Sequence, residues 1–233
     1  CALPISIENK IYGDGVIRVA GEVSVKSSDI SDYHGEWDVL GKLKTVDRSF
    51  TTSSQWGTGN VNIEPQGSVV VTNNSNGSLF VFDNTLSGSG TLLVNFSGSG
   101  NGTDLYTPTF KIQQGTTSEF TGMVELAGEK NKKVVYILDS DELSTSGIRV
   151  SDNSVLSVGR DDSSKETFTL GKLDIAGGEL NIGDIQTGSP TSNKTIRVTK
   201  KLNADGEGTV RIDTSAGFIN AVPTTESELE TLQ

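Results

Sequence analysis

The sequence predicts an all-β protein in which short strands wind into a solenoid of stacked β coils. Triplets that alternate apolar, polar and apolar residues start at Val124, Ile148, Leu173 and Ile196, at intervals of 24, 25 and 23 residues. A second series starts at Leu156, Leu180 and Leu202, at intervals of 24 and 22 residues. Self-similarity at such a period is the signature of a repeat architecture, and the alternation within each triplet is typical of a short strand.

The composition agrees with a narrow solenoid. Of the 233 residues, 33% are hydrophobic and 6% are aromatic, which is little for a thick globular core. The 27 glycines lie mostly at turns between the extended segments. A repeat array grows by stacking and needs no single central core. We therefore expect one β-helical segment over residues 1–233, with about ten coils at about 24 residues per coil.

Extended segments follow one another along the whole chain, and most carry a polar residue at their centre. One face of each strand is thus expected to point inward while the other meets solvent. Besides the two registered series, the segments lie at residues 17–19, 23–25, 61–63, 69–71, 79–82, 92–96, 110–112 and 210–212. Helix signals are confined to the glutamate-rich tail at 224–233, which is a short helix or a frayed end.

Two stretches interrupt the period. Residues 27–59 lose the spacing and hold a large share of the aromatic residues, and residues 98–108 form a polar loop. Excursions of this kind leave a solenoid and carry what is particular to each protein. We expect the function to depend on these two stretches.

The amino-acid sequence of the repeats, as well as their spacing, is similar to that of repeats in a known family. The stretches DNTLSGSGTLLVNFSG at 83–98 and FTGMVELAG at 120–128 resemble the passenger-domain repeats of AIDA-type autotransporter adhesins of Gram-negative bacteria. The stretches GIRVSDNSVLSVG at 147–159 and GKLDIAGGELNIG at 171–183 do so too. The resemblance covers about residues 67–212, and its motifs are structural repeats and not active-site motifs.

The resemblance implies a right-handed parallel β-helix that is exported through the outer membrane by a C-terminal barrel. It also implies that the chain is exposed on the bacterial cell surface or secreted, and that its activity is adhesion, autoaggregation or biofilm formation. Residues 1–59 do not share the sequence pattern of the repeats, so the resemblance says nothing about them. No binding residue is assigned by it, because ligand sites in this family lie on variable faces and loops.

The net charge of −11 argues against nucleic acid and anionic membrane as partners, because binding to polyanions requires a basic stripe. Only Lys130, Lys132 and Lys133 cluster in the sequence, and we interpret them as a solvated loop. No apolar run approaches the ~20 residues that cross a bilayer. The single cysteine, Cys1, excludes an internal disulfide and is either a lipidated terminus or a fragment boundary.

The main competing class is an enzyme on the same solenoid, such as a polysaccharide lyase or depolymerase. Such enzymes gather carboxylates with an arginine or histidine on one face for acid and base chemistry. Asp161 and Asp162 beside Arg160 are the obvious acidic pair, which we interpret as a solvated turn, and His34 is the only histidine. No nucleophile motif of a serine hydrolase occurs. We therefore expect no catalytic residue and no enzyme activity.

One segment, DSDE at 139–142, is a dense cluster of the hard oxygen ligands that calcium prefers. The calcium-binding GGxGxD nonapeptide is absent, and a single acidic cluster more often solvates a turn. One histidine and one cysteine cannot complete a zinc site. We expect neither a metal nor a cofactor.

The candidate binding residues are Tyr33, His34 and Trp37, which lie within five residues of one another and are flanked by acids. Aromatic rings beside polar groups are typical of surfaces that stack sugars or contact proteins. The alternative is that Trp37 packs inside the coil.

Together these observations favour a non-enzymatic segment of a bacterial cell-surface adhesin. Polar side chains that repeat at ~4.8 Å from coil to coil would form ladders in which weak contacts add. The expected partners are identical passengers on another cell, or host glycan or matrix protein. The alternatives are a polysaccharide-active β-helix and a passive stalk that lifts another domain from the membrane.

Overall fold

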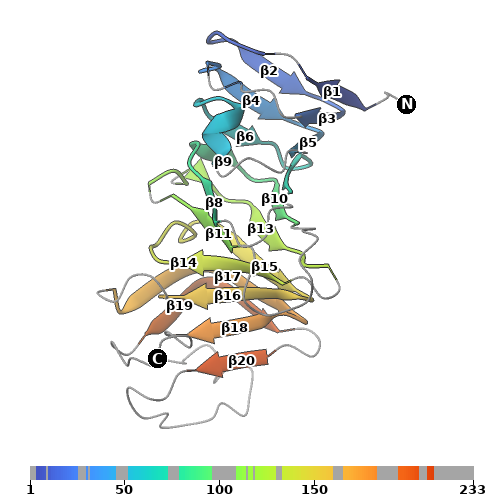
Figure 1. Cartoon of the computed structure of the whole chain (residues 1–233). Coiled ribbons are helices and arrows are strands. Elements are labelled where there is room, and N and C mark those ends of the chain that lie inside the picture. Colours follow the sequence, from blue (N-terminus) through green and yellow to red (C-terminus); the bar gives the residue numbers. More distant parts are fainter. Residues whose placement is uncertain are drawn as a thin grey trace.

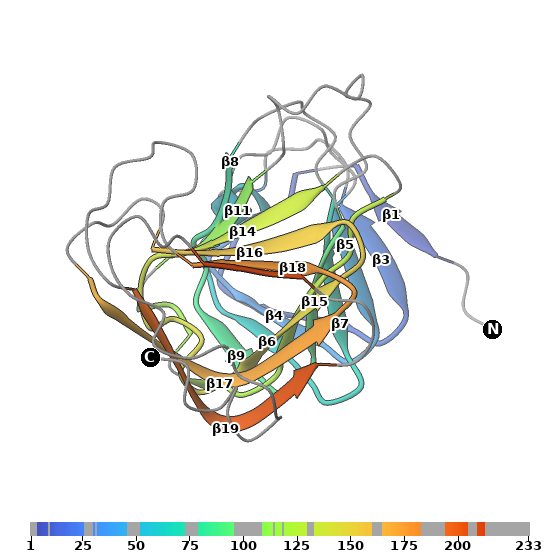
Figure 2. The ribbon, with the colours of Figure 1, turned by 90° about the horizontal axis from the view of Figure 1, so that it is seen from below.

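The strands form three parallel sheets that wind around one axis, as in a parallel β-helix (Figure 1). The computed structural model describes residues 4–8, 10–25, 30, 32–45, 52–72, 79–95, 109–113, 115–117, 119–129, 133–159, 165–182, 194–204 and 209–212. A view along the axis shows the three sheets as the sides of one coil around a shared interior (Figure 2). The predicted all-β solenoid is therefore confirmed.

The sheets are named by their size. The long sheet has nine described strands, in the spatial order β1 (Ile5–Ile7), β3 (Glu22–Val25), β5 (Lys42–Thr45), β7 (Ser68–Val71), β10 (Thr91–Val94), β13 (Met123–Leu126), β15 (Gly147–Ser151), β17 (Thr167–Ala176) and β19 (Thr195–Ala204). The second sheet has β8 (Leu79–Phe82), β11 (Thr109–Ile112), β14 (Val134–Leu138), β16 (Ser154–Val158), β18 (Glu179–Ile182) and β20 (Thr209–Ile212). The third sheet has β2 (Val16–Val19), β4 (Glu36–Val39), β6 (Val61–Ile63), β9 (Leu86–Gly88) and β12 (Glu119–Phe120). One 3-10 helix, η1 (Ser53–Trp56), is the only helix in the described part of the chain.

The register confirms the predicted stacking for three of the four triplets. Val124 lies opposite Ile148, which lies opposite Leu173 on the next strand. Leu156 likewise lies opposite Leu180, as the second series predicts. These positions are the inward ones, so an aliphatic residue recurs there in each coil.

The prediction for the last member of each series is wrong. Ile196 lies opposite Phe168 and not opposite Leu173. Leu202 lies opposite Leu173 on the long sheet, whereas Val210 takes the position beside Leu180. The reason is that β17 and β19 are ten-residue strands, each of which supplies two inward runs, with a register shift between them.

One continuous apolar core fills the interior, and an aromatic ladder forms part of it. The rings of Trp56, Phe80, Phe110 and Tyr136 follow one another with centroids 6.0, 5.8 and 5.6 Å apart. All four side chains are at most 1% exposed. Aromatic neighbours at such distances contribute beyond the area that they bury, so the ladder ties together three successive strands of the second sheet.

Glycines form the corner that leads into the long sheet. A Cβ atom on Gly122 would lie 2.0 Å from the carbonyl oxygen of Gly90, and one on Gly41 would lie 2.3 Å from that of Gly21. No side chain fits at such a distance, so the corner requires glycine for its close backbone approach. The same corner amides link the coils, since Met123 N–H donates to the Gly90 oxygen at 3.1 Å.

The expectation that residues 27–59 leave the coil is wrong for their central part. Strands β4 and β5 lie in the third and long sheets, in register with the strands on either side. The periodic pattern is hidden there because Trp37 occupies an inward position that is aliphatic in most other coils. The excursion at 98–108, the tail at 224–233 and Cys1 lie outside the described residues.

Candidate functional site

Two of the three candidate binding residues belong to the core. Tyr33 is 2% exposed and Trp37 is 1% exposed, and their rings meet edge to face with centroids 5.6 Å apart. The Trp37 Nε1–H donates to the Trp56 carbonyl at 3.0 Å, and the Tyr33 hydroxyl lies 2.7 Å from the carbonyl oxygens of Gly15 and Glu36. The packing alternative therefore describes these two residues, and they cannot stack on a ligand.

His34 is the exposed member of the three candidate residues. Its Nδ1 lies 2.7 Å from Thr58 Oγ1, across one coil. Without the neighbouring rings, a single imidazole does not make a contact surface. The candidate site therefore has to be sought on the outer faces of the sheets.

The outer face of the third sheet carries a polar ladder over four strands, formed by Arg18, Asp38, Asn62 and Ser87. These residues lie opposite one another in register. Arg18 Nε lies 3.5 Å from Asp38 Oδ2, and Asn62 Nδ2–H donates to Asp38 Oδ1 at 3.2 Å. Ser87 Oγ donates in turn to Asn62 Oδ1 at 3.3 Å. One ion pair and two hydrogen bonds thus link the third-sheet ladder from β2 to β9.

The long sheet carries a second ladder, formed by Glu125, Arg149, Asp174 and Asn203. These residues are also in register on adjacent strands. Arg149 Nη1 lies 3.6 Å from Asp174 Oδ2, and Asn203 Nδ2–H donates to Asp174 Oδ1 at 3.5 Å. Surface ion pairs of this kind contribute about 0–1 kcal/mol each. The notable property of the long-sheet ladder is therefore its repetition and not its strength.

A cationic face, which the repeat pattern did not predict, lies at the end of the long sheet. Residues 194–204 hold four cations and no acid, in a chain whose net charge is −11. Lys201 of β19 lies opposite Lys172 of β17. Lys172 and Lys201 each precede an inward leucine, and Arg197 lies between two inward aliphatic residues, so all three face outward. We call Lys172, Arg197 and Lys201 the cationic face.

Only the strand register brings the cationic face together. Lys172 and Lys201 are 29 residues apart in the sequence (201 − 172). The stacking predicted for the last triplet, with Ile196 opposite Leu173, does not place these two lysines opposite each other. The available signal was the run of cations without acids at 194–204. Of the predicted lysine cluster, Lys133 forms an ion pair with Glu179 at 3.3 Å, whereas Lys130 and Lys132 lie outside the described residues.

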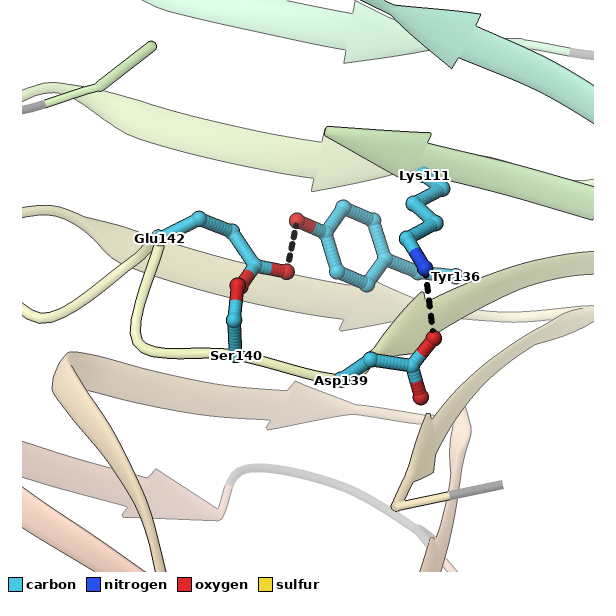
Figure 3. Close-up of polar contacts among 5 residues, drawn as sticks. All are labelled: Lys111, Tyr136, Asp139, Ser140 and Glu142. Atoms are coloured by element: carbon cyan, nitrogen blue, oxygen red, sulfur yellow. Dashed lines mark hydrogen bonds and ion pairs between the residues drawn. The ribbon is translucent and has the colours of Figure 1, made fainter. Parts of the chain in front are cut away.

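A buried polar cluster lies at the end of the aromatic ladder. Glu142, on the segment between β14 and β15, is 4% exposed and points toward the fully buried Tyr136 (Figure 3). The Tyr136 hydroxyl donates to Glu142 Oε1 at 3.1 Å, and the Ser140 hydroxyl donates to Oε2. Burial raises the pKa of Glu142 to about 7. No substrate reaches these groups, so the cluster belongs to the core.

The other acids of the segment at 139–142 turn away from Glu142. Asp139 forms an ion pair with Lys111 at 2.8 Å (Figure 3). Asp141 forms one with Lys165 at 2.9 Å and accepts the Thr169 N–H at 2.7 Å. No group of three or more histidine, cysteine, aspartate or glutamate side chains suited to a metal occurs among the residues described. Arg160, Asp161 and Asp162 lie outside that part of the chain.

Comparison with known proteins gives one distant similarity. The chain is 26% identical over 219 residues, 92% of its length, to the uncharacterized protein YuaQ of Escherichia coli (strain K12). The aligned part is 14% of the length of that protein, so the chain spans a small part of it. No known protein family and no solved structure matches the chain. In the described residues, no helix has the length and hydropathy needed to cross a membrane.

Proposed function

We propose that this chain is a non-enzymatic segment of a bacterial cell-surface adhesin, similar to the passenger domain of AIDA-type autotransporters. It acts at the cell surface or as a secreted segment, in adhesion, autoaggregation or biofilm formation. The observation that supports the proposal is the coil-to-coil register of polar side chains on the outer faces of the third and long sheets. Identical passengers, host glycans and matrix proteins are the proposed partners.

The mechanism is multivalent. Adjacent rungs of a ladder lie ~4.8 Å apart, so a partner that repeats along the rod meets the same kind of side chain several times. Each exposed contact contributes about 1 kcal/mol or less, but linked contacts raise the effective concentration of the next one. Affinity then depends on the length of rod that is engaged.

The state of the acids favours this function over the polysaccharide-active alternative. Glycoside chemistry needs a carboxyl pair that faces the substrate. Around the densest acidic segment, Asp139 and Asp141 are paired with lysines and Glu142 is buried. These acids are engaged within the coil, and none of the three is presented as a free acid–base pair.

A bead assay tests the proposed function. Beads that carry the folded chain should clump, or bind surfaces coated with matrix proteins or glycans, and should do so less at high salt because exposed charges are screened beyond ~8 Å. Beads that carry the same chain unfolded in urea are the control for nonspecific adsorption. Absence of both clumping and binding would favour the passive stalk, and release of reducing ends from polysaccharides would favour the enzyme.

A further inference from the structure

We propose that the cationic face, Lys172, Arg197 and Lys201, binds anionic polysaccharide through its carboxylate or sulfate groups. The proposal rests on the adhesive function proposed above and names a ligand class and a site for it. The site lies on the outer face of β17 and β19, at the end of the long sheet (Figure 1).

The two lysines stand side by side at an energetic cost. Neighbouring strands are ~4.8 Å apart, and like charges directly opposite each other in a sheet destabilise it. Within the described residues, neither lysine nor Arg197 forms an ion pair or a side-chain hydrogen bond, whereas Asp174 on the same strand is engaged by Arg149. An anion held between Lys172 and Lys201 would neutralise both ammonium groups.

Arg197 lies earlier on β19 than Lys201. It lies opposite Thr169, on the other side of the register shift from Lys201. A guanidinium holds a carboxylate or sulfate through two parallel N–H donors, which a lysine cannot do. The face therefore offers two anion positions along one strand, as a chain of repeating acidic sugars requires.

The surroundings favour a polysaccharide over nucleic acid or membrane. Binding of single-stranded nucleic acid uses exposed aromatic rings for stacking, but the aromatic ring in this part of β17, Phe168, is fully buried. Membrane attachment uses exposed apolar side chains beside the cations. The large exposed apolar residues of the described chain are Ile5, Tyr12, Val16 and Leu79, all on or near strands of other coils.

The test measures binding of defined oligosaccharides to the full chain. The probes are a sulfated heparin octasaccharide, a carboxylated galacturonate octamer and a neutral dextran octamer, each at 50 and 300 mM NaCl. The variant Lys172→Gln/Lys201→Gln removes the paired lysines. Its matched control, Lys42→Gln/Lys44→Gln, removes the same charge from β5 at the other end of the long sheet.

We expect the wild-type chain and the control to bind at least one anionic octamer and not dextran. The Lys172→Gln/Lys201→Gln variant should bind about tenfold or more weakly, with a shallower salt dependence because fewer ions are released. If that variant fails to fold, Arg197→Gln gives the same comparison. Heparin binding alone identifies sulfate as the ligand group, and galacturonate binding alone identifies carboxylate.

Equal binding by the variant and the control, or no binding of either anionic octamer at 50 mM NaCl, would overturn the proposal. Loss of bead clumping in the variant without loss of oligosaccharide binding would overturn it too, and would point to an acidic protein surface. These outcomes leave the adhesive function intact. Failure of the bead assay with intact oligosaccharide binding would instead remove the adhesive function and keep the site.

Discussion

Replacing Glu142 by glutamine should stabilise the protein at alkaline pH. The carboxyl group is 4% exposed and shares its oxygens with the Tyr136 and Ser140 hydroxyls. Glutamine keeps an oxygen that accepts the Tyr136 hydrogen bond and an amide that donates to Ser140. It removes the charge, which is the part of Glu142 that burial disfavours.

The magnitude follows from the pKa of Glu142, which burial raises from its ordinary 4.5 to about 7. Each unit of difference between the folded and unfolded pKa corresponds to 1.36 kcal/mol, so the effect amounts to about 3 kcal/mol. Because the folded pKa is the higher one, the stabilisation is complete below pH 4.5 and is lost as the pH rises to about 7. Glutamine does not titrate, so position 142 of the variant contributes no change in the free energy of unfolding over this range.

Urea unfolding at pH 5, 6, 7 and 8 measures the difference between the two chains. The free energy of unfolding of Glu142→Gln relative to wild type should rise from pH 5 through pH 7 and level off at about pH 8. Comparison at equal pH removes the titration of all other groups, and Glu125→Gln, on the outer face of β13, is the matched control. A difference between variant and wild type that does not change with pH would refute the buried, raised-pKa carboxyl.

Three further changes test the packing. Phe110→Ala should lower the free energy of unfolding by about 3–5 kcal/mol, measured in urea, because this fully buried ring joins the aromatic ladder on both sides. Gly122→Ala should lower the thermal midpoint, because its Cβ would lie 2.0 Å from a carbonyl oxygen, whereas Gly15→Ala, with no atom within 4 Å of its Cβ, should not. Arg149→Ala should change the free energy of unfolding by about 1 kcal/mol or less, since its pair with Asp174 is half exposed; a larger loss would make the long-sheet ladder a structural element.

The repeating part of the fold could be predicted because one residue type meets one environment in each coil. Val124, Ile148 and Leu173 all point into the same narrow core, so their spacing gives the strand stacking directly. The last coil could not be placed in this way. Its strand β19 is long enough to hold two inward runs, and the spacing of Ile196 fits either partner.

The site could be predicted less well, because it depends on which side of a strand each residue faces. Glu36 and Asp38 flank Trp37, and this alternation places the indole inward once the strand is known. The aromatic cluster alone leaves a contact surface and a packed core both open, because residues 27–59 do not show the spacing of the other coils. The burial of Glu142 results from the path of the chain between β14 and β15. An acidic segment in the sequence does not predict that path.

The corner glycines make the coil a removable unit of length. Gly147 N–H donates to the Gly122 oxygen just as Met123 N–H donates to the Gly90 oxygen. Removing residues 123–146 would leave Gly147 bonded to Gly122 along the chain and would bring β15 beside β10, and β16 beside β11. Duplication or loss of such a stretch of gene would change how far the rod reaches while leaving the chemistry of its remaining coils unaltered. The length of the rod, and with it the number of rungs in each ladder, is thus able to change by one coil at a time.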